Sequence, residues 1–255
     1  MSSWLFSAVL TEITMNPVDQ RADASISDFE FDALAEAKNY RRALMEEFGE
    51  FIRGNVLEVG AGIGQVTELI RQNPRANRVV AIEPDRGLAS QHRLIHPDHE
   101  VVEGFLDDAP KDIAWDAIIS VNVLEHIEDD LAELKKYSSV LSGKRGHLCL
   151  FVPARPEIYA PIDKDFGHFR RYLTGDIRQV LQAAQFEVVR LDYFNCVGYF
   201  AWWLNFCVLK KRTFEISKVR FYDRVIFPLV HHWEMNHRRP SFGQSIIAVA
   251  RATGT

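Results

Sequence analysis

The chain has 255 residues, of which 47% are hydrophobic, so it can bury one large core. Its formal net charge of -5 gives no basic field that would gather polyphosphate, which argues against nucleic acid as a main partner. Cys149, Cys196 and Cys207 form neither a CxxC pair nor an even set, so we expect a reducing, cytoplasmic location.

The chain begins with a weakly specified segment. Residues 1–27 lack the basic start of a signal peptide and are expected to form an arm, followed by one domain over 28–255. From Phe29 to Phe51, apolar residues recur at helical spacing among charged ones. This spacing predicts an amphipathic helix, which Gly54 ends.

Five apolar strands then alternate with helices. The strands are predicted at NVLEV, RVVAIE, EVVEG, WDAIISV and HLCLFVP, and helices are expected from about Gly64, after Asp85, and from about Asp129 to Leu141. Because such strands are covered on both faces, this order predicts an α/β fold with a parallel sheet and right-handed crossovers. Ligands of such sheets bind beyond the carboxyl ends of the strands.

The pattern changes after Pro153. A polar segment leads to a helix that Thr174 is expected to cap, with Asp176 in its first turn, and then to the strand FEVVRLDYF. An aromatic insertion over 195–242 separates this strand from a last one, QSIIAVARA, and is expected to be a substrate-side lid or a dimer interface. Its longest apolar run is too short to span a membrane, so any membrane contact would be peripheral.

A glycine-rich turn, EVGAGIG, follows the first strand and opens a helix. Gly60, Gly62 and Gly64 let the backbone come close to a ligand at the helix N-terminus, or they simply pack the turn. Gln65 breaks a G-x-G-x-x-G fingerprint, which argues against an NAD-dependent oxidoreductase. Glu83 ends the second strand, where its carboxylate can accept hydrogen bonds from two ribose hydroxyls, and this favours a nucleotide-like ligand.

These motifs resemble those of class I S-adenosylmethionine-dependent methyltransferases. The stretch from Glu58 to Gly64 resembles their first motif, Glu83 their ribose-binding acid, and NVLEHI (122–127) the motif after their fourth strand. The GHFRRY segment and the last strand resemble members encoded beside sugar transferases. The resemblance implies a Rossmann-like sheet of seven strands with an antiparallel last strand, a helical and aromatic insertion between the last two strands, and S-adenosylmethionine as the cofactor.

The resemblance also implies which residues hold the cofactor. The backbone from Gly60 to Gly64 would contact its methionine part, and Phe105 and Leu106 would flank the adenine, although many relatives carry an acid where this chain has Phe105. Tyr40 either reaches the cofactor from an approach helix or packs in the core. The expected cofactor-binding residues are Tyr40, Glu58, Gly60, Ala61, Gly62, Gly64, Glu83, Pro84, Phe105, Leu106, Asp107, Asn122 and Val123.

Methyl transfer needs an aligned nucleophile, and a base where that nucleophile carries a proton. His126 and His168 are the candidate catalytic bases, because imidazole titrates near neutral pH, although either could instead support its loop. The substrate-binding candidates are Arg170, Arg171, Tyr172, Tyr199 and Trp203, and the two arginines could equally form surface ion pairs. Glu125 and the adjacent His126 provide too few ligands for a metal ion, so no metal site is expected.

The sequence thus predicts S-adenosylmethionine-dependent methyl transfer to a small-molecule acceptor. Transfer to oxygen is favoured, and the resemblance suggests a sugar, a lipid-linked compound or a secondary metabolite. The alternatives are N- or C-methylation of a small metabolite, or a non-catalytic scaffold that binds the cofactor. We expect a monomer or a homodimer whose main partner is the acceptor.

Overall fold

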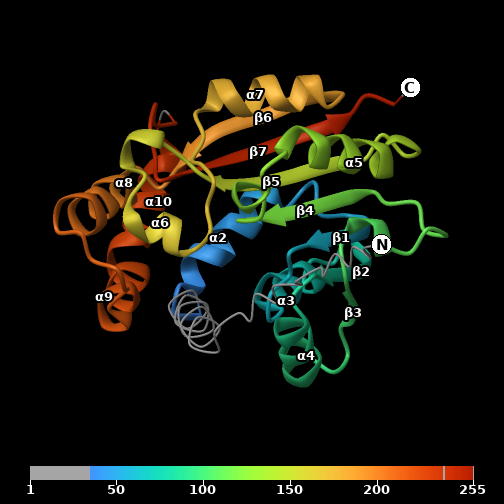
Figure 1. Ribbon diagram of the computed structural model, residues 1–255, viewed down its shortest axis with the longest axis horizontal. Coiled ribbons are helices and arrows are strands. Elements are labelled where there is room, and N and C mark those ends of the chain that lie inside the picture. Colours follow the sequence, from blue (N-terminus) through green and yellow to red (C-terminus); the bar gives the residue numbers. More distant parts are fainter. Residues whose placement is uncertain (1–34, 238, 255) are drawn as a thin grey trace, which may run out of the picture.

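The computed structural model describes residues 35–237 and 239–254 (Figure 1). The predicted arm over 1–27 and the start of the helix expected at Phe29 lie outside the described residues. Within them, helix α2 runs over Lys38–Phe48. Its first turn is bound from far along the chain, because the Asp223 carboxylate accepts hydrogen bonds from the backbone N–H groups of Asn39 and Tyr40 at 3.1 and 2.9 Å.

Seven strands form a single sheet in the order β3-β2-β1-β4-β5-β7-β6 (Figure 1). They are β1 (Gly54–Val59), β2 (Ala76–Glu83), β3 (Glu100–Glu103), β4 (Ala117–Val121), β5 (His147–Pro153), β6 (Phe186–Phe194) and β7 (Ser245–Ala252). Strands β1 to β5 pair in parallel, and β7 lies antiparallel between β5 and β6. The predicted seven-stranded sheet with an antiparallel last strand is therefore confirmed.

Helices cover both faces of this sheet. The helices from Gln65 to Ala183 are α3 (Gln65–Arg71), α4 (Arg86–Ile95), α5 (Asp130–Ser142), α6 (Pro161–Asp165) and α7 (Thr174–Ala183), with short 3-10 turns η1 (Leu106–Asp108), η2 (Leu124–His126) and η3 (Pro156–Ile158). Successive strand residues point to opposite faces, so β1 sends Leu57 to the core under α5 and α7, and Val56 to the core under α2 and α3. Figure 1 shows α5 and α7 on one side of the sheet and α2 and α3 on the other.

Acidic side chains fix the starts of the helices. As expected, Asp85 precedes α4 and accepts the N–H of Leu88 at 2.8 Å. At α7 the expectation was wrong, because Thr174 is the first helical residue and Leu173 takes the capping position. The carboxylate of Asp176 reaches back and accepts the N–H of Leu173 at 2.9 Å.

The insertion between β6 and β7 is helical. It contains α8 (Cys196–Trp202), the π-helical η4 (Trp203–Val208), α9 (Ile216–Phe221), the π-helical η5 (Tyr222–Ile226) and α10 (Phe227–Asn236). Together they form a lobe at one end of the sheet, on the left of Figure 1. No helix among the described residues is both long enough and apolar enough to cross a membrane.

Candidate active site

A cavity of about 710 Å³ lies at the carboxyl ends of β1, β2 and β4, where the parallel strands place their following loops. Most of the predicted cofactor residues line it. These are Tyr40, Glu58, Gly60, Ala61, Gly62, Glu83, Pro84, Phe105, Leu106, Asn122 and Val123, joined by the candidate base His126. Of the other predicted residues, Gly64, Asp107 and His168 lie outside this lining.

The glycine loop follows a path that excludes side chains. Gly60 has a φ of +72°, and a Cβ there would lie 2.4 Å from Cγ2 of Val123. Gly64 has a φ of +91°, and a Cβ there would lie 2.4 Å from the Nε2 atom of His92. Glycine is therefore favoured at both positions for steric as well as conformational reasons, and at Gly60 the bare backbone forms part of the cavity wall.

Glu83 is held in place by the loops on either side of it. One carboxylate oxygen accepts the N–H of Gly62 at 2.7 Å, and the other accepts the N–H of Asp85 at 2.9 Å. Burial raises the pKa of this carboxyl, and the two backbone hydrogen bonds oppose that rise. Because a carboxylate has about four acceptor positions and these two bonds use one on each oxygen, two positions remain for ribose hydroxyls.

Glu58 lies beneath the glycine loop. Its carboxyl accepts a hydrogen bond from the hydroxyl of Thr67, and burial raises its pKa to about 8. At neutral pH this side chain is therefore mainly protonated, so it adds little negative charge to the cavity.

Arg41 lines the same cavity and was missed from the sequence. Its Nη2 atom donates to the carbonyl of Ala35 at 3.1 Å, but its buried Nη1 atom has no hydrogen-bond partner among the described residues. Burial lowers the pKa of this guanidinium. A partly desolvated cation without a full set of acceptors calls for an anionic ligand, and the methionine carboxylate of the expected cofactor fits that need.

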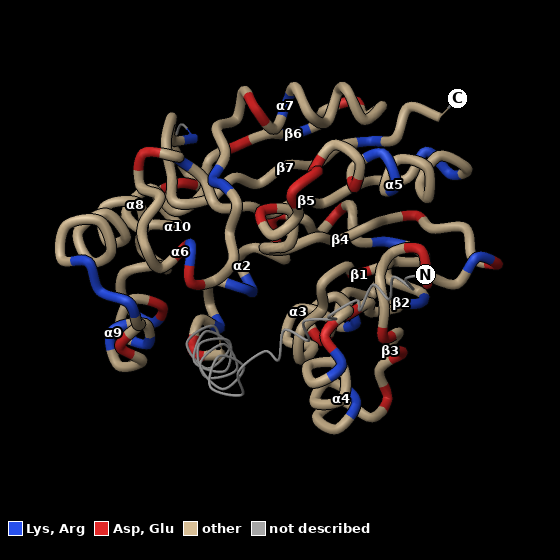
Figure 2. The backbone as a smooth tube through the Cα atoms, viewed as in Figure 1, with Lys and Arg blue, Asp and Glu red and all other residues tan. Residues whose placement is uncertain are grey.

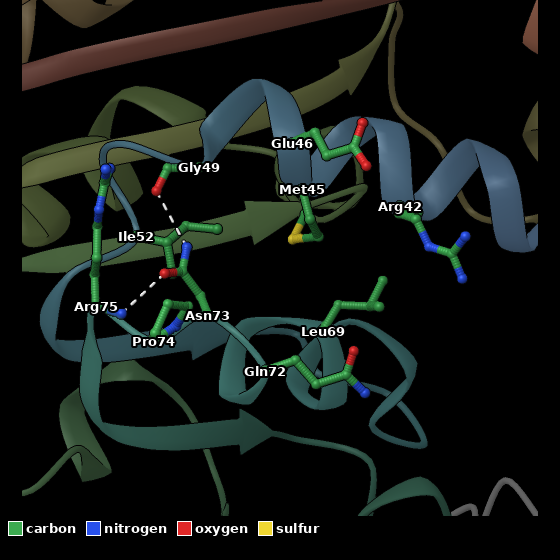
Figure 3. Close-up of a pocket in the computed structure, with 10 residues that line it drawn as sticks. All are labelled: Arg42, Met45, Glu46, Gly49, Ile52, Leu69, Gln72, Asn73, Pro74 and Arg75. Carbon is green, nitrogen blue, oxygen red and sulfur yellow. Dashed lines mark hydrogen bonds between the residues drawn. The ribbon is translucent and has the colours of Figure 1, made fainter.

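The neighbouring Arg42 faces a different part of the molecule. It lines a second cavity, of about 530 Å³, between α2 and α3 (Figure 3). There Asn73 donates from its side-chain amide to the carbonyl of Gly49 at 3.1 Å. This cavity contains none of the residues expected to bind the cofactor or the substrate.

The two candidate bases lie together. The rings of His126 and His168 are perpendicular, with centroids 4.7 Å apart, and Nδ1 of His168 donates to Asp163 at 3.0 Å. Enclosure, and then the charge of His168, lower the pKa of His126 to about 4. Although burial raises the pKa of Asp163, hydrogen bonds from His168 and Arg171 hold it below its usual value. His126 is therefore neutral at pH 7, so one of its two ring nitrogens carries no proton.

Glu125 belongs to the same group of side chains. It is fully buried, and one ligand atom from each of Glu125, His126 and His168 lies within 4.8 Å of the others. The sequence showed only the adjacent pair, because His168 comes from a loop beyond β5. The three side chains have the closeness that a metal ion requires of its ligands.

The arginines and the tyrosine of the GHFRRY segment bind protein groups. Arg170 reaches Asp130 at 2.9 Å, and Tyr172 donates to the same carboxylate at 3.1 Å. The side chain of Arg171 is only 2% exposed and donates to Asp163 at 2.8 Å. These contacts fasten the segment to α5 and α6, and the expected substrate contacts of all three side chains stay predictions.

Three further predicted residues lie away from the cavity lining. Tyr199 packs edge-on against Phe242, with ring centroids 5.6 Å apart. Trp203 is 47% exposed on the lobe, and Asp107 pairs with Lys136 at 3.3 Å. The lobe approaches the cavity indirectly, since Phe214 stacks on the cavity residue Phe166 with centroids 6.2 Å apart.

Comparison with known proteins places this site in context. Residues 32–191 match the family model described as a methyltransferase domain. A curated relative, ribosomal RNA small subunit methyltransferase A of Koribacter versatilis, is 31% identical over 134 residues. That match covers 52% of this chain but only 37% of the relative, so the chain spans less than half of the relative's length.

Solved structures share the fold over nearly the whole chain. An S-adenosylmethionine-dependent methyltransferase from Clostridium acetobutylicum matches 94% of this chain and 100% of its own, with a TM-score of 0.56 and 13% identity. The match to DhpI in complex with SAH covers 91% of this chain and 93% of the DhpI chain, with a TM-score of 0.56 and 18% identity. A third match is to a complex of the Haloferax volcanii Trm112 methyltransferase activator and a methyltransferase. It covers 91% of this chain and 97% of the matched chain, with a TM-score of 0.60 and 15% identity.

Proposed function

This chain belongs to the methyltransferase domain family, and we propose that it methylates an oxygen atom of a small-molecule acceptor. Its cofactor is S-adenosylmethionine, which supplies an activated methyl group when bound. The observation that carries the proposal is that His126 shares one cavity with the glycine loop and Glu83. A neutral imidazole thus stands where the acceptor must meet the methyl donor.

The chain's own residues divide the work of holding the cofactor. The glycine backbone and Arg41 would receive the methionine part, since N–H groups and a guanidinium both attract a carboxylate. Glu83 would accept the ribose hydroxyls, and Phe105 and Leu106 would flank the adenine. These contacts leave His126 at the acceptor end of the cavity.

His126 would take the proton of the acceptor hydroxyl as the acceptor oxygen bonds to the methyl carbon, and the bond between that carbon and the cofactor's sulfur would break with its electron pair left on the sulfur. Because the pKa of His126 is about 4, this imidazole is unprotonated over the physiological range, but it is a weak base by itself. His168 lies against it and is held by the Asp163 carboxylate, which can stabilise a positive charge on the imidazole pair. We propose that the pair, rather than His126 alone, receives the proton.

The acceptor end of the cavity favours a small and partly apolar molecule. Ile127, Phe151 and Phe166 line the same cavity as His126 and add apolar surface to it. The chain has a net charge of -5, which is unfavourable for RNA as a main partner, and the ribosomal RNA methyltransferase matches over only 37% of its length. These observations favour a small-molecule acceptor over the substrate named for that relative.

Methyl-labelled S-adenosylmethionine tests the proposal directly. The protein is incubated with host extract separated into small-molecule, lipid and RNA fractions, and labelled products are identified by mass spectrometry. We expect labelled O-methyl products in a non-RNA fraction, strongly reduced with His126→Asn and unchanged with His232→Asn, an exposed histidine on α10.

Three outcomes would overturn the proposal. Label found in RNA would point to a nucleic acid substrate, and label on nitrogen or carbon would assign a different acceptor atom. Cofactor binding without any labelled product would favour a non-catalytic scaffold.

A further inference from the structure

The lobe formed by α8 to α10 (residues 196–236) exposes a large apolar surface. Leu229 is 72% exposed and Phe221 is 58% exposed. Most of the exposed large apolar side chains of the described residues lie in this lobe, and the remainder are scattered over other elements. Contiguous exposed apolar surface marks a site of interaction, whereas single exposed side chains do not.

Eight of these side chains form two rows. They recur every three or four residues along each helical run, so each row follows one side of its run. The rows are Val197, Phe200, Leu204 and Val208 on α8 and η4, and Phe221, Val225, Leu229 and Trp233 on α9, η5 and α10.

The other sides of both runs are already buried against the protein. Phe206 packs in the cluster that includes Ile158 and Ile162, and Phe227 lies 4.9 Å from Tyr40 between ring centroids. Both runs are therefore apolar on the outside as well as on the inside. Helices of this kind occur inside protein cores or against lipid.

The same lobe is basic although the chain as a whole is acidic. It carries six basic residues, Lys210, Lys211, Arg212, Lys218, Arg220 and Arg224, against three acidic ones. Figure 2 shows Lys and Arg on the loop before α9 and on α9 itself. Apolar rows with aromatic side chains beside Lys and Arg are the pattern of helices that lie in a membrane interface.

The acidic residues of the lobe do little to offset this basic surface. The buried Asp223 carboxylate accepts hydrogen bonds from the first turn of α2. The buried Glu234 carboxylate accepts the N–H groups of Asn195 and Cys196 at 3.2 and 2.7 Å. The exposed acid of the three, Glu215, accepts from Lys211 and Lys218, both at 2.7 Å.

The remaining basic residues either pair with acids outside the lobe or form no ion pair among the described residues. Arg220 pairs with Glu36 at 2.8 Å, and Arg212 pairs with Asp165. Lys210 and Arg224 form no ion pair among the residues that the structure describes. Arg220 and Arg212 each hold their carboxylate through two nitrogens, whereas Lys210 and Arg224 can meet lipid phosphate without breaking an ion pair.

We propose that this lobe binds the surface of an anionic membrane, with its apolar rows in the headgroup region and its basic residues on the lipid phosphates. A second copy of the chain fits less well, because a two-fold interface brings each patch against itself and would set the basic residues of one copy against those of the other. An anionic bilayer satisfies both the apolar rows and the positive charge.

The position of the lobe relates membrane binding to the candidate active site. Its Phe214 stacks on Phe166, which lines the cavity beside His126, so a bound membrane would lie next to the acceptor end. If the proposed O-methylation is correct, this arrangement favours an acceptor held in or on the bilayer. That last step rests on the proposed function, whereas membrane binding itself does not.

Vesicle sedimentation tests membrane binding without any methyl transfer. The full chain is mixed with vesicles of phosphatidylcholine alone or of an equal mixture of phosphatidylcholine and phosphatidylglycerol. We expect binding to the mixed vesicles, weaker binding to phosphatidylcholine, and release at high salt. Leu229→Ser removes one exposed apolar side chain and should weaken partitioning by about tenfold.

The matched control is Leu94→Ser, since Leu94 is 83% exposed on α4, away from the lobe (Figure 1). It should leave vesicle binding unchanged, whereas Lys210→Glu with Arg224→Glu should abolish the preference for phosphatidylglycerol. Unaltered cofactor binding will show that each variant is folded. Failure to bind either vesicle, equal losses at Leu94 and Leu229, or a dimer lost on Leu229→Ser without vesicle binding would overturn the proposal.

Discussion

Replacing Arg41 with glutamine tests the assignment of the carboxylate end of the cofactor. The wild-type side chain brings a positive charge and a buried Nη1 donor to the cavity, while Arg41→Gln keeps a polar side chain without the charge. A hydrogen bond to a charged group contributes about 1.5–3 kcal/mol, so the dissociation constant of S-adenosylmethionine should rise roughly 10- to 150-fold.

Calorimetry with two ligands separates this contact from a general disturbance of the cavity. Decarboxylated S-adenosylmethionine lacks the group that Arg41 would bind, so the wild type should bind it more weakly than S-adenosylmethionine by a similar factor. The Arg41→Gln variant should bind both ligands with nearly equal affinity, because neither can then form the ion pair.

Arg42→Gln is the control, because Arg42 is the next residue of α2 and lines the other cavity (Figure 3). It should leave both dissociation constants unchanged. Wild-type affinity in a folded Arg41→Gln variant would refute the reasoning, as would a wild type that does not distinguish the two ligands.

Three further predictions concern Glu83, His126 and metal ions. Glu83→Gln leaves one acceptor oxygen and should raise the cofactor's dissociation constant at least tenfold, as measured by calorimetry. The control is Glu103→Gln, since Glu103 is the register neighbour of Glu83 on β3, and it should leave that constant unchanged. Equal effects of the two substitutions would contradict the ribose assignment. The unfolded chain protonates His126 near pH 6.5 and the folded chain near pH 4, so the unfolding free energy should fall as the pH drops through this window. Urea titrations should show a smaller fall for His126→Asn, and an identical fall would argue against the lowered pKa. Because the proposed reaction uses no metal, EDTA should leave methyl transfer unchanged; a loss that Zn²⁺ restores would instead assign a metal to Glu125, His126 and His168.

The sequence by itself predicted the strands along the chain, and it predicted the glycine turn and the acid that line one cavity. Strands buried on both faces appear as apolar runs, and a glycine turn followed by an acid at the end of the next strand is a local pattern. The predicted family, the sheet with its antiparallel last strand, and the enzyme class are accordingly confirmed. Gly60 and Glu83 could be found because each needs only its near neighbours in the chain.

The tertiary structure decided what depends on contacts between distant residues. The first turn of α2 is bound by Asp223, which is 183 residues from Tyr40, and no local signal indicates that pairing. Arg41 and Arg42 are neighbours on α2, and the packing of this helix sends Arg41 into the cavity that the glycine loop lines and Arg42 to a second cavity.

The proposed acceptor half of the site depends on the same long-range packing. His126 follows β4 and His168 follows β5, and the folded loops bring their rings together. The apolar rows of the lobe follow from helical spacing, but their exposure depends on which sides Phe206 and Phe227 bury. Local spacing sets the face of a helix on which a side chain lies, and only the fold sets whether that face meets protein or solvent.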